Sequence, residues 1–258
     1  MNDMRPLFLL SNDDGVQAKG LKELIDMLSP LGDLLVMAPD GPRSGSACAI
    51  TSHDPLHYRV VEVRPGVKVC ACSGTPVDCV KLALEQEAGR KPDLVIGGIN
   101  HGDNSSVSVH YSGTMGIVLE GCMKGIPSVG FSLRDFGADA DFSFAVPFVR
   151  DIVKRMLGEG LPQGTCLNVN FPKAEGKAYA GLKVCRMARG TWTSEWGEAR
   201  HPRGMKYFWL TGRFVNLEPE STDTDEWALA HGFVSVVPVK IDLTDCALLD
   251  KLKGWEAL

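Results

Sequence analysis

The chain has 258 residues, of which 44% are hydrophobic and 23% charged, and its net charge at pH 7 is −5. This composition is typical of a folded protein with one α/β domain and extensions, or with two small domains. The negative charge argues against a nucleic acid polymer as partner, because such binding needs clustered Lys and Arg, and no apolar run approaches the ~18–20 residues that span a membrane.

The N-terminal residues and the cysteines indicate in which cellular compartment the protein works. No basic region followed by a long apolar stretch opens the chain, so we expect no secretory signal. The eight cysteines are scattered and form no C-x-x-C pair, which predicts small buried residues with free thiols and no zinc or redox motif. Together these features predict a soluble, cytoplasmic protein with no membrane partner.

Short apolar runs alternate with segments of helical spacing in the first 170 residues. Apolar residues at 21, 24, 25 and 28, for example, fall on one helical face. In chain order we expect a strand at 7–10, a helix through 21–28, a strand at 34–38, one or two strands within 58–72, a helix from 75, a strand at 93–96, a helix at 113–124, a strand at 128–132, a helix through 149–156 and a strand at 167–171. This alternation favours βαβ units and a mostly parallel sheet.

The rest of the chain has a different character. Residues 183–192 and 206–215 are strand-like and rich in aromatic residues, with a turn between them. They predict a long hairpin that projects from the core. A hairpin is barely stable alone in water, so we expect it to pack on a partner subunit, with packing on its own core as the alternative. Residues 223–258 predict a helix start, a strand at 233–239 and a terminal helix, and the acidic stretch 218–226 predicts a solvated segment.

Two adjacent carboxylates, Asp13 and Asp14, follow the first predicted strand. Adjacent acids repel each other, and the end of a buried strand is a poor place to leave them uncompensated. A divalent cation with oxygen ligands would relieve the repulsion. The alternative is that one of the two acids caps the next helix, which leaves the second unexplained.

Polar residues also follow two further strands, at 40–46 and 100–104. Ligands of open parallel sheets bind at the carboxyl ends of the strands, so these clusters could meet Asp13 and Asp14 there. Their hard oxygen donors suit Mg²⁺, Mn²⁺ or Ca²⁺. Residues 112–114, Ser-Gly-Thr at a predicted helix start, offer free backbone N–H groups that could hold a phosphate, although Ser-Gly-Thr is also a common helix start.

With these motifs the chain resembles a known family, the SurE (survival-protein E) 5′-nucleotidases. The similarity runs nearly from end to end and in the same order. The matching motifs are Ser-Asn-Asp-Asp-Gly at 11–15, Ala-Pro-Asp at 38–40, Arg-Ser-Gly at 43–45, Ser-Gly-Thr-Pro-x-Asp at 73–78, Gly-Ile-Asn-x-Gly-x-Asn at 98–104, Tyr-Ser-Gly-Thr at 111–114, Gly-Ile-Pro-Ser at 125–128, Thr-Asp-Thr-Asp at 222–225 and Gly-Phe-Val-Ser-Val at 232–236.

The resemblance implies a metal-dependent phosphomonoesterase that hydrolyses nucleoside 5′-monophosphates, with 3′-monophosphates and short polyphosphate as further candidate substrates. It implies one divalent metal ion per subunit, Mg²⁺ or Mn²⁺, held by Asp13, Asp14, Ser44 and Asn100. Gly41-Pro42 before Arg43 and the lack of acidic residues in 105–110 depart from the family pattern. We expect these departures to alter substrate preference without removing a metal ligand.

The resemblance also implies a Rossmann-like α/β fold with a mostly parallel sheet flanked by helices, a projecting β-hairpin and an exchanged C-terminal extension. We divide this single domain into a core at 1–182, a hairpin at 183–220 and a C-terminal oligomerisation segment at 221–258. The expected assembly is a homodimer or a homotetramer.

The chemistry of phosphate ester hydrolysis assigns roles to the candidate residues. Asp13 and Asp14 are the candidate catalytic residues, and either an activated water or an aspartate could be the nucleophile. The candidate substrate-binding residues are Asn12, Asn104, Ser112, Gly113 and Thr114.

Other polar residues in these motifs have simpler explanations. His101 or His110 could protonate the leaving ribose oxygen, because histidine titrates near neutral pH, but a loop histidine with no role is the favoured explanation. Asp78 and Asp103 are expected to structure a helix start and a loop.

Two competing functions remain. A haloacid-dehalogenase-type phosphatase would carry Asp-x-Asp-Gly-Thr after the first strand, whereas here the acids are adjacent and Val16 follows the glycine. A non-catalytic oligomer that senses nucleotide or metal is the alternative outside enzymes, and the surplus of oxygen ligands argues against it.

Overall fold

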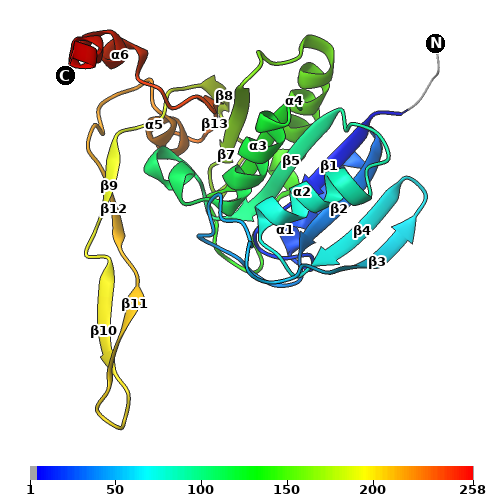
Figure 1. Cartoon of the computed structure of the whole chain (residues 1–258), viewed down its shortest axis with the longest axis horizontal. Coiled ribbons are helices and arrows are strands. Elements are labelled where there is room, and N and C mark those ends of the chain that lie inside the picture. The colour runs from blue at the N-terminus through cyan, green and yellow to red at the C-terminus, as the bar shows by residue number, and fades with distance from the viewer. Residues whose placement is uncertain (1–4, 258) are drawn as a thin grey trace.

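A nine-stranded sheet forms the centre of the computed structural model, which describes residues 5–257 (Figure 1). Its strand order is β3-β4-β2-β1-β5-β6-β7-β13-β8. Six neighbouring strands run parallel: β4 (Val67–Cys72), β2 (Asp33–Pro39), β1 (Leu7–Ser11), β5 (Leu94–His101), β6 (Ser128–Leu133) and β7 (Thr165–Phe171). The expected mostly parallel sheet is confirmed.

The other three strands extend this sheet at its two ends. β3 (Tyr58–Arg64) pairs antiparallel with β4 through the turn at 65–66. At the far end, β13 (Phe233–Lys240) pairs antiparallel with β7 and parallel with β8 (Gly181–Val184). The C-terminal part of the chain therefore supplies a strand to the central sheet.

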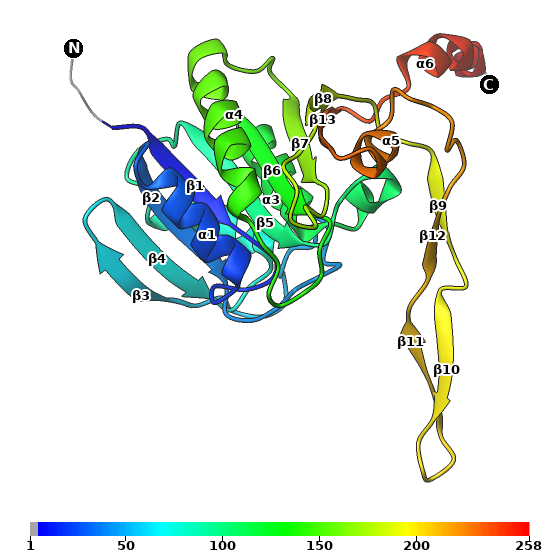
Figure 2. The same cartoon turned by 180° about the vertical axis from the view of Figure 1, so that it is seen from behind.

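Helices cover both faces of the sheet because the parallel strands are apolar on both sides. Phe8 and Leu10 pack in one core cluster with residues of α1 (Lys19–Leu28) and α4 (Val146–Glu159). Leu9 belongs to the opposite cluster, with α2 (Pro76–Gln86) and α3 (Gly113–Met123). Figures 1 and 2 show these two layers from opposite sides. Short 3-10 turns at η1 (Ser106–His110) and η2 (Ser143–Ala145) complete this part of the chain.

The expected hairpin extends far from the sheet (Figure 2). It consists of two successive ribbons, β9 (Gly190–Thr193) with β12 (Arg213–Asn216), and β10 (Trp196–Arg200) with β11 (Lys206–Leu210). Ser194 separates the ribbons with a left-handed backbone, φ 52°. The aromatic residues of the outer ribbon, such as Trp196 and Trp209, are exposed.

The C-terminal segment contains α5 (Asp225–Ala230), β13, α6 (Cys246–Leu252) and η3 (Lys253–Ala257). The prediction that 218–226 is solvated was wrong at its end, because Thr224 and Asp225 are fully buried. The Asp225 carboxylate accepts hydrogen bonds from the backbone N–H groups of Ser106 and Ala188. A buried acid is tolerated where such bonds satisfy its oxygens.

Two further expectations concern the thiols and the membrane. All eight cysteines are free. Six of them are buried, as expected, whereas Cys48 and Cys246 are exposed, so for these two the expected burial was wrong. Across residues 5–257 no helix combines the length and the apolar character that crossing a membrane requires.

Candidate active site

The loops that follow β2, β1 and β5 meet at one edge of the sheet because these strands are neighbours and parallel. The Arg43 N–H in the loop after β2 donates to the Asp13 carbonyl over 2.7 Å. The His101 N–H at the end of β5 donates to Asp14 Oδ2 over 3.1 Å. The structure therefore brings the three polar clusters of the sequence together around Asp13 and Asp14.

Asp13 lies against the N-terminus of α3. Its side chain is almost fully buried, and Thr114 Oγ1 donates a hydrogen bond of 2.6 Å to Asp13 Oδ1. Gly113 packs so closely that a Cβ there would stand 2.7 Å from the Asp13 Cβ. The free N–H groups and partial positive charge of a helix start favour an anion at this place.

Burial raises the pKa of both carboxyl groups. Burial, together with the neighbouring charge of Asp14, raises the pKa of Asp13 to about 6, although the hydrogen bond from Thr114 acts in the opposite direction. Burial also raises the pKa of Asp14, against the hydrogen bond from the His101 backbone. The raised pKa values mean that the charged forms of Asp13 and Asp14 lack a compensating positive charge. A bound cation would supply that charge.

Buried oxygen atoms without a hydrogen-bond partner lie in the same loops. Asn12 Oδ1 and Ser46 Oγ are two such atoms within the described part of the chain. Ser46 Oγ stands 2.9 Å from the place where a Cβ on Gly113 would be, so it lies close to Asp13. Across residues 5–257 no three His, Cys, Asp or Glu side chains gather as a metal site. Two carboxylates with neutral oxygens fit a hard cation such as Mg²⁺ or Mn²⁺.

Ser44 is in the loop after β2 and Asn100 is in β5, and these two strands lie on either side of β1. Ser44 is exposed, and it follows Arg43, whose backbone is bonded to Asp13. Asn100 lies one residue before the end of β5 and is largely buried, and its Nδ2 donates to the Gly102 carbonyl over 2.8 Å. The amide nitrogen is a donor only, so Asn100 Oδ1 is the atom that a cation could bind.

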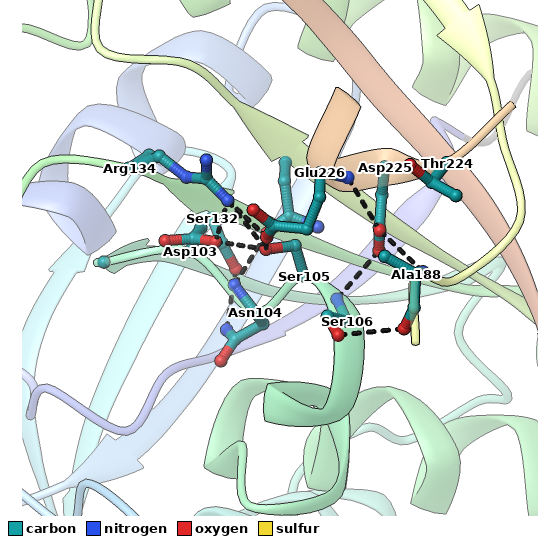
Figure 3. A network of polar contacts seen from close by, with 12 residues as sticks. Asp103, Asn104, Ser105, Ser106, Ser132, Arg134, Ala188, Thr224, Asp225 and Glu226 are labelled. Carbon is teal, nitrogen blue, oxygen red and sulfur yellow. Dashed lines mark hydrogen bonds and ion pairs between the residues drawn. The ribbon is translucent and has the colours of Figure 1, made fainter. Parts of the chain in front are cut away.

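The predicted substrate-binding residues fall into two groups. Gly113 and Thr114 touch Asp13, while Ser112 caps α3, with its hydroxyl accepting from the Met115 N–H over 3.0 Å. Asn12 precedes the aspartates, and its Nδ2 donates to the Gly15 carbonyl. Asn104 lies apart from them in a polar network, where its Nδ2 donates to Ser132 Oγ over 2.8 Å (Figure 3).

The remaining polar residues have these positions. The His101 ring lies edge-on to Phe142, with its Nδ1 3.2 Å from the Gly137 carbonyl, and His110 is exposed. Asp78 forms a capping box with Thr75 at the start of α2, which confirms its expected helix-start role.

Ser46 and the backbone N–H of His101 were not among the predicted site residues. Ser46 stood inside the polar cluster 43–46, but nothing in the sequence shows which hydroxyl of a loop becomes buried.

Comparisons with known proteins agree with this geometry. The family described as Survival protein SurE matches residues 8–194. A protein from Phocaeicola vulgatus named 5′-nucleotidase SurE is 56% identical, covering 99% of this chain and 98% of its own, and one of the same name from Bacteroides fragilis is 53% identical over 99% and 100%. The crystal structure of the SurE protein from Aquifex aeolicus has a TM-score of 0.81 at 36% identity and covers 97% of this chain and 100% of its own.

Proposed function

This chain belongs to the SurE family, and from that premise we propose that it is a metal-dependent 5′-nucleotidase, which hydrolyses nucleoside 5′-monophosphates to nucleoside and phosphate. One observation of the structure carries the proposal. Two adjacent carboxylates, Asp13 and Asp14, share a buried edge of the sheet with the N-terminus of α3. A cation at the carboxylates and N–H groups at the helix start would hold the two sides of one phosphate.

We propose that Asp13, Asp14, Ser44 and Asn100 hold the metal ion, Mg²⁺ or Mn²⁺. When bound, such an ion supplies positive charge to the phosphoryl oxygens and makes a nearby water more acidic. Thr114 fixes one oxygen of Asp13, and the backbone of His101 fixes one oxygen of Asp14. Both aspartates can therefore act as catalytic residues from defined positions, to orient or deprotonate the attacking water.

We propose that Asn12, Asn104, Ser112, Gly113 and Thr114 form the substrate-binding side of the site, either by contacting the phosphate or by holding the loops that do so. The backbone N–H groups of Gly113 and Thr114 lie in the first turn of α3, beside Asp13. The hydroxyl of Ser112 already caps the helix, so its contribution would come from holding this turn in place. The resulting site neutralises charge and positions groups, which is most of what phosphoryl transfer requires.

The proposal predicts phosphate release that depends on a divalent metal. Purified protein should release phosphate from nucleoside 5′-monophosphates with Mg²⁺ or Mn²⁺, lose this activity in EDTA, and regain it when the metal is restored. A panel with 3′-monophosphates and short polyphosphate defines the substrate range. No release with any metal would contradict the proposal and favour a nucleotide- or metal-sensing oligomer.

We further propose a homodimer or homotetramer built through the hairpin at 183–220 and the C-terminal segment at 221–258. The exposed fractions of Trp196, Phe208, Trp209 and Leu210 are 66%, 56%, 63% and 69%. Exposed apolar residues gathered in this way mark interaction surfaces, and an isolated two-stranded ribbon is marginal in water. α6 also buries none of its residues within the chain.

Deleting residues 190–212 should therefore lower the mass of the particle measured by light scattering. The expected change is a shift toward the monomer, because the deletion removes the exposed aromatic residues. Lys206→Ala, on the same hairpin but removing only the exposed pair with Glu198, should leave the mass unchanged. A deletion variant with the wild-type mass would show that the hairpin does not hold the assembly.

We also propose that the protein works in the cytoplasm. All eight of its cysteines are free thiols, and a reducing compartment keeps them in that state.

A further inference from the structure

The loop that follows Asn100 is tied to a part of the chain more than one hundred residues away. Asp103 and Ser105 in this loop meet Arg134, which follows β6, and Glu226, in the first turn of α5 (Figure 3). We call Asp103, Ser105, Arg134 and Glu226 the Arg134 clasp. These residues touch neither Asp13 nor Asp14 through any hydrogen bond among residues 5–257, so they lie outside the proposed site.

Arg134 is the cation at the centre of the clasp. Its Nη2 lies 2.8 Å from Asp103 Oδ2, 3.0 Å from Ser105 Oγ and 2.5 Å from Glu226 Oε1. The hydroxyl of Ser105 contacts both carboxylates, but it has one proton and can donate to only one of them. Asp103 and Glu226 therefore remain close together because of the guanidinium between them.

A second tie lies one residue further along the loop. Ser106 has a left-handed backbone, φ 51°, which is costly for a residue with a side chain. Its N–H donates to Asp225 Oδ2 over 2.8 Å, and its hydroxyl donates to the Ala188 carbonyl over 2.9 Å. The first residues of α5 and the base of the hairpin thus hold the loop from the same side.

On its other side the loop is bonded to the central sheet. The Asn104 N–H donates to Asn170 Oδ1 over 2.7 Å, and Asn168 Nδ2 donates to the Asn104 carbonyl over 2.8 Å. Asn104 thus has a fixed position between β7 and the clasp. A movement of the clasp would therefore also move Asn104. It would also move Asn100, which is only three residues before Asp103.

We propose that Arg134 is a positioning residue, which holds Asp103 to Glu226 and thereby fixes the loop from Asn100 to Asn104 at the metal site. The proposal rests on the proposed function, since it takes Asn100 as a metal ligand. Arg134 and Ser105 keep the pKa of Asp103 below its usual value although burial acts to raise it, so the carboxylate is charged at neutral pH. Without Arg134, two largely buried carboxylates would repel each other and separate α5 from the loop.

The test compares Arg134→Met with Arg134→Lys. We expect the methionine variant to bind Mn²⁺ at least tenfold more weakly, to lose at least tenfold in kcat/KM, and to exchange the backbone amides of 101–106 faster. Lysine keeps the charge, and all three clasp contacts of Arg134 are made by Nη2 alone, so a lysine ammonium group should recover part of each loss. The readouts are Mn²⁺ titration by electron paramagnetic resonance, steady-state kinetics, and hydrogen exchange by mass spectrometry.

Arg186→Met is the matched control. Arg186 also joins two carboxylates, Glu218 and Asp223, but none of these residues contacts the loop at 100–106 through a hydrogen bond in the described chain. We expect this variant to change Tm while its Mn²⁺ affinity and KM stay within twofold of the wild type. A loss of the same size as in Arg134→Met would show a general effect of stability and would overturn the proposal.

A milder variant covers the case in which Arg134→Met does not fold. Glu226→Gln keeps the shape of the side chain and removes one charge, and we expect a two- to fivefold loss in Mn²⁺ affinity with faster exchange at 103–106. Unchanged affinity and exchange in both Glu226→Gln and Arg134→Lys would overturn the proposal. If the wild-type protein binds Mn²⁺ but releases no phosphate, the proposed function fails while the binding and exchange measurements still decide the role of Arg134.

Discussion

Replacing Asp13 with asparagine should lower kcat for nucleoside 5′-monophosphates by about 10³-fold, the order of loss expected when a metal ligand or general base is removed. Asparagine keeps the shape of the side chain and can still accept the hydrogen bond from Thr114, which is 2.6 Å long in the structure. It cannot carry the negative charge that holds a cation. Phosphate release at saturating substrate and Mn²⁺ affinity measure the two losses.

The fold should survive this substitution. Asp13 is buried, and burial raises the pKa of its carboxyl group, which means that the charged form is disfavoured in the protein without metal. A neutral side chain of the same shape therefore fits the site at least as well, and Tm without metal should not fall.

Asp93→Asn is the matched control for Asp13. Asp93 lies at the opposite end of the neighbouring strands β1 and β5. Its carboxylate accepts a hydrogen bond from the Leu7 N–H over 2.8 Å and forms an ion pair with Arg90. We expect a small change in Tm and an unchanged kcat. If Asp13→Asn keeps its activity, or if Asp93→Asn loses as much, the assignment of the active site to the end of β1 is wrong.

The sheet could be predicted from the sequence because each of its parallel strands is a short run of apolar residues. Leu7 to Leu10 read as a strand buried on both faces, and the structure places Leu9 in one core and Leu10 in the other. The projecting hairpin was predictable for a similar reason, since its aromatic strands are separated by a polar turn. Both signals are local, so the sequence shows them without knowledge of the fold.

The candidate site was predictable to the extent that its residues follow strand ends. Asp13 and Asp14 follow β1, Asn100 lies near the end of the neighbouring parallel strand β5, and this topology alone brings them together. The Ser-Gly-Thr at 112–114 was likewise recognisable as the start of a helix.

The clasp and the burial of Asp225 could not be predicted from the sequence. Asp225 bonds to Ser106 across 119 positions, and Arg134 bonds to Glu226 across 92. An acidic stretch without periodicity looks the same in the sequence whether it is solvated or satisfied by distant backbone groups. Its burial follows from the place of β13 in the sheet, which sets α5 beside the loop at 103–106.

Gly113→Ala should lower kcat/KM by about 10²-fold, which is the scale on which a small misplacement of a catalytic group acts. A methyl group there would stand 2.7 Å from the Asp13 Cβ and 2.9 Å from both Asp13 Oδ2 and Ser46 Oγ. The Cβ of Asp13 is fixed to a buried backbone and cannot turn aside as the end of a long side chain can. The aspartate or the first turn of α3 must therefore move.

The same crowding should cost about 1–3 kcal/mol of stability, the usual range for overpacking a buried site, even though alanine favours the helix. Gly158→Ala is the matched control, because Gly158 is in α4 and a Cβ there meets nothing within 4 Å. It should raise stability by up to about 1 kcal/mol and leave kcat/KM unchanged. Steady-state kinetics, Mn²⁺ titration and thermal unfolding of both variants measure these effects. Full activity in Gly113→Ala would mean that close contact between Asp13 and α3 is not needed for catalysis.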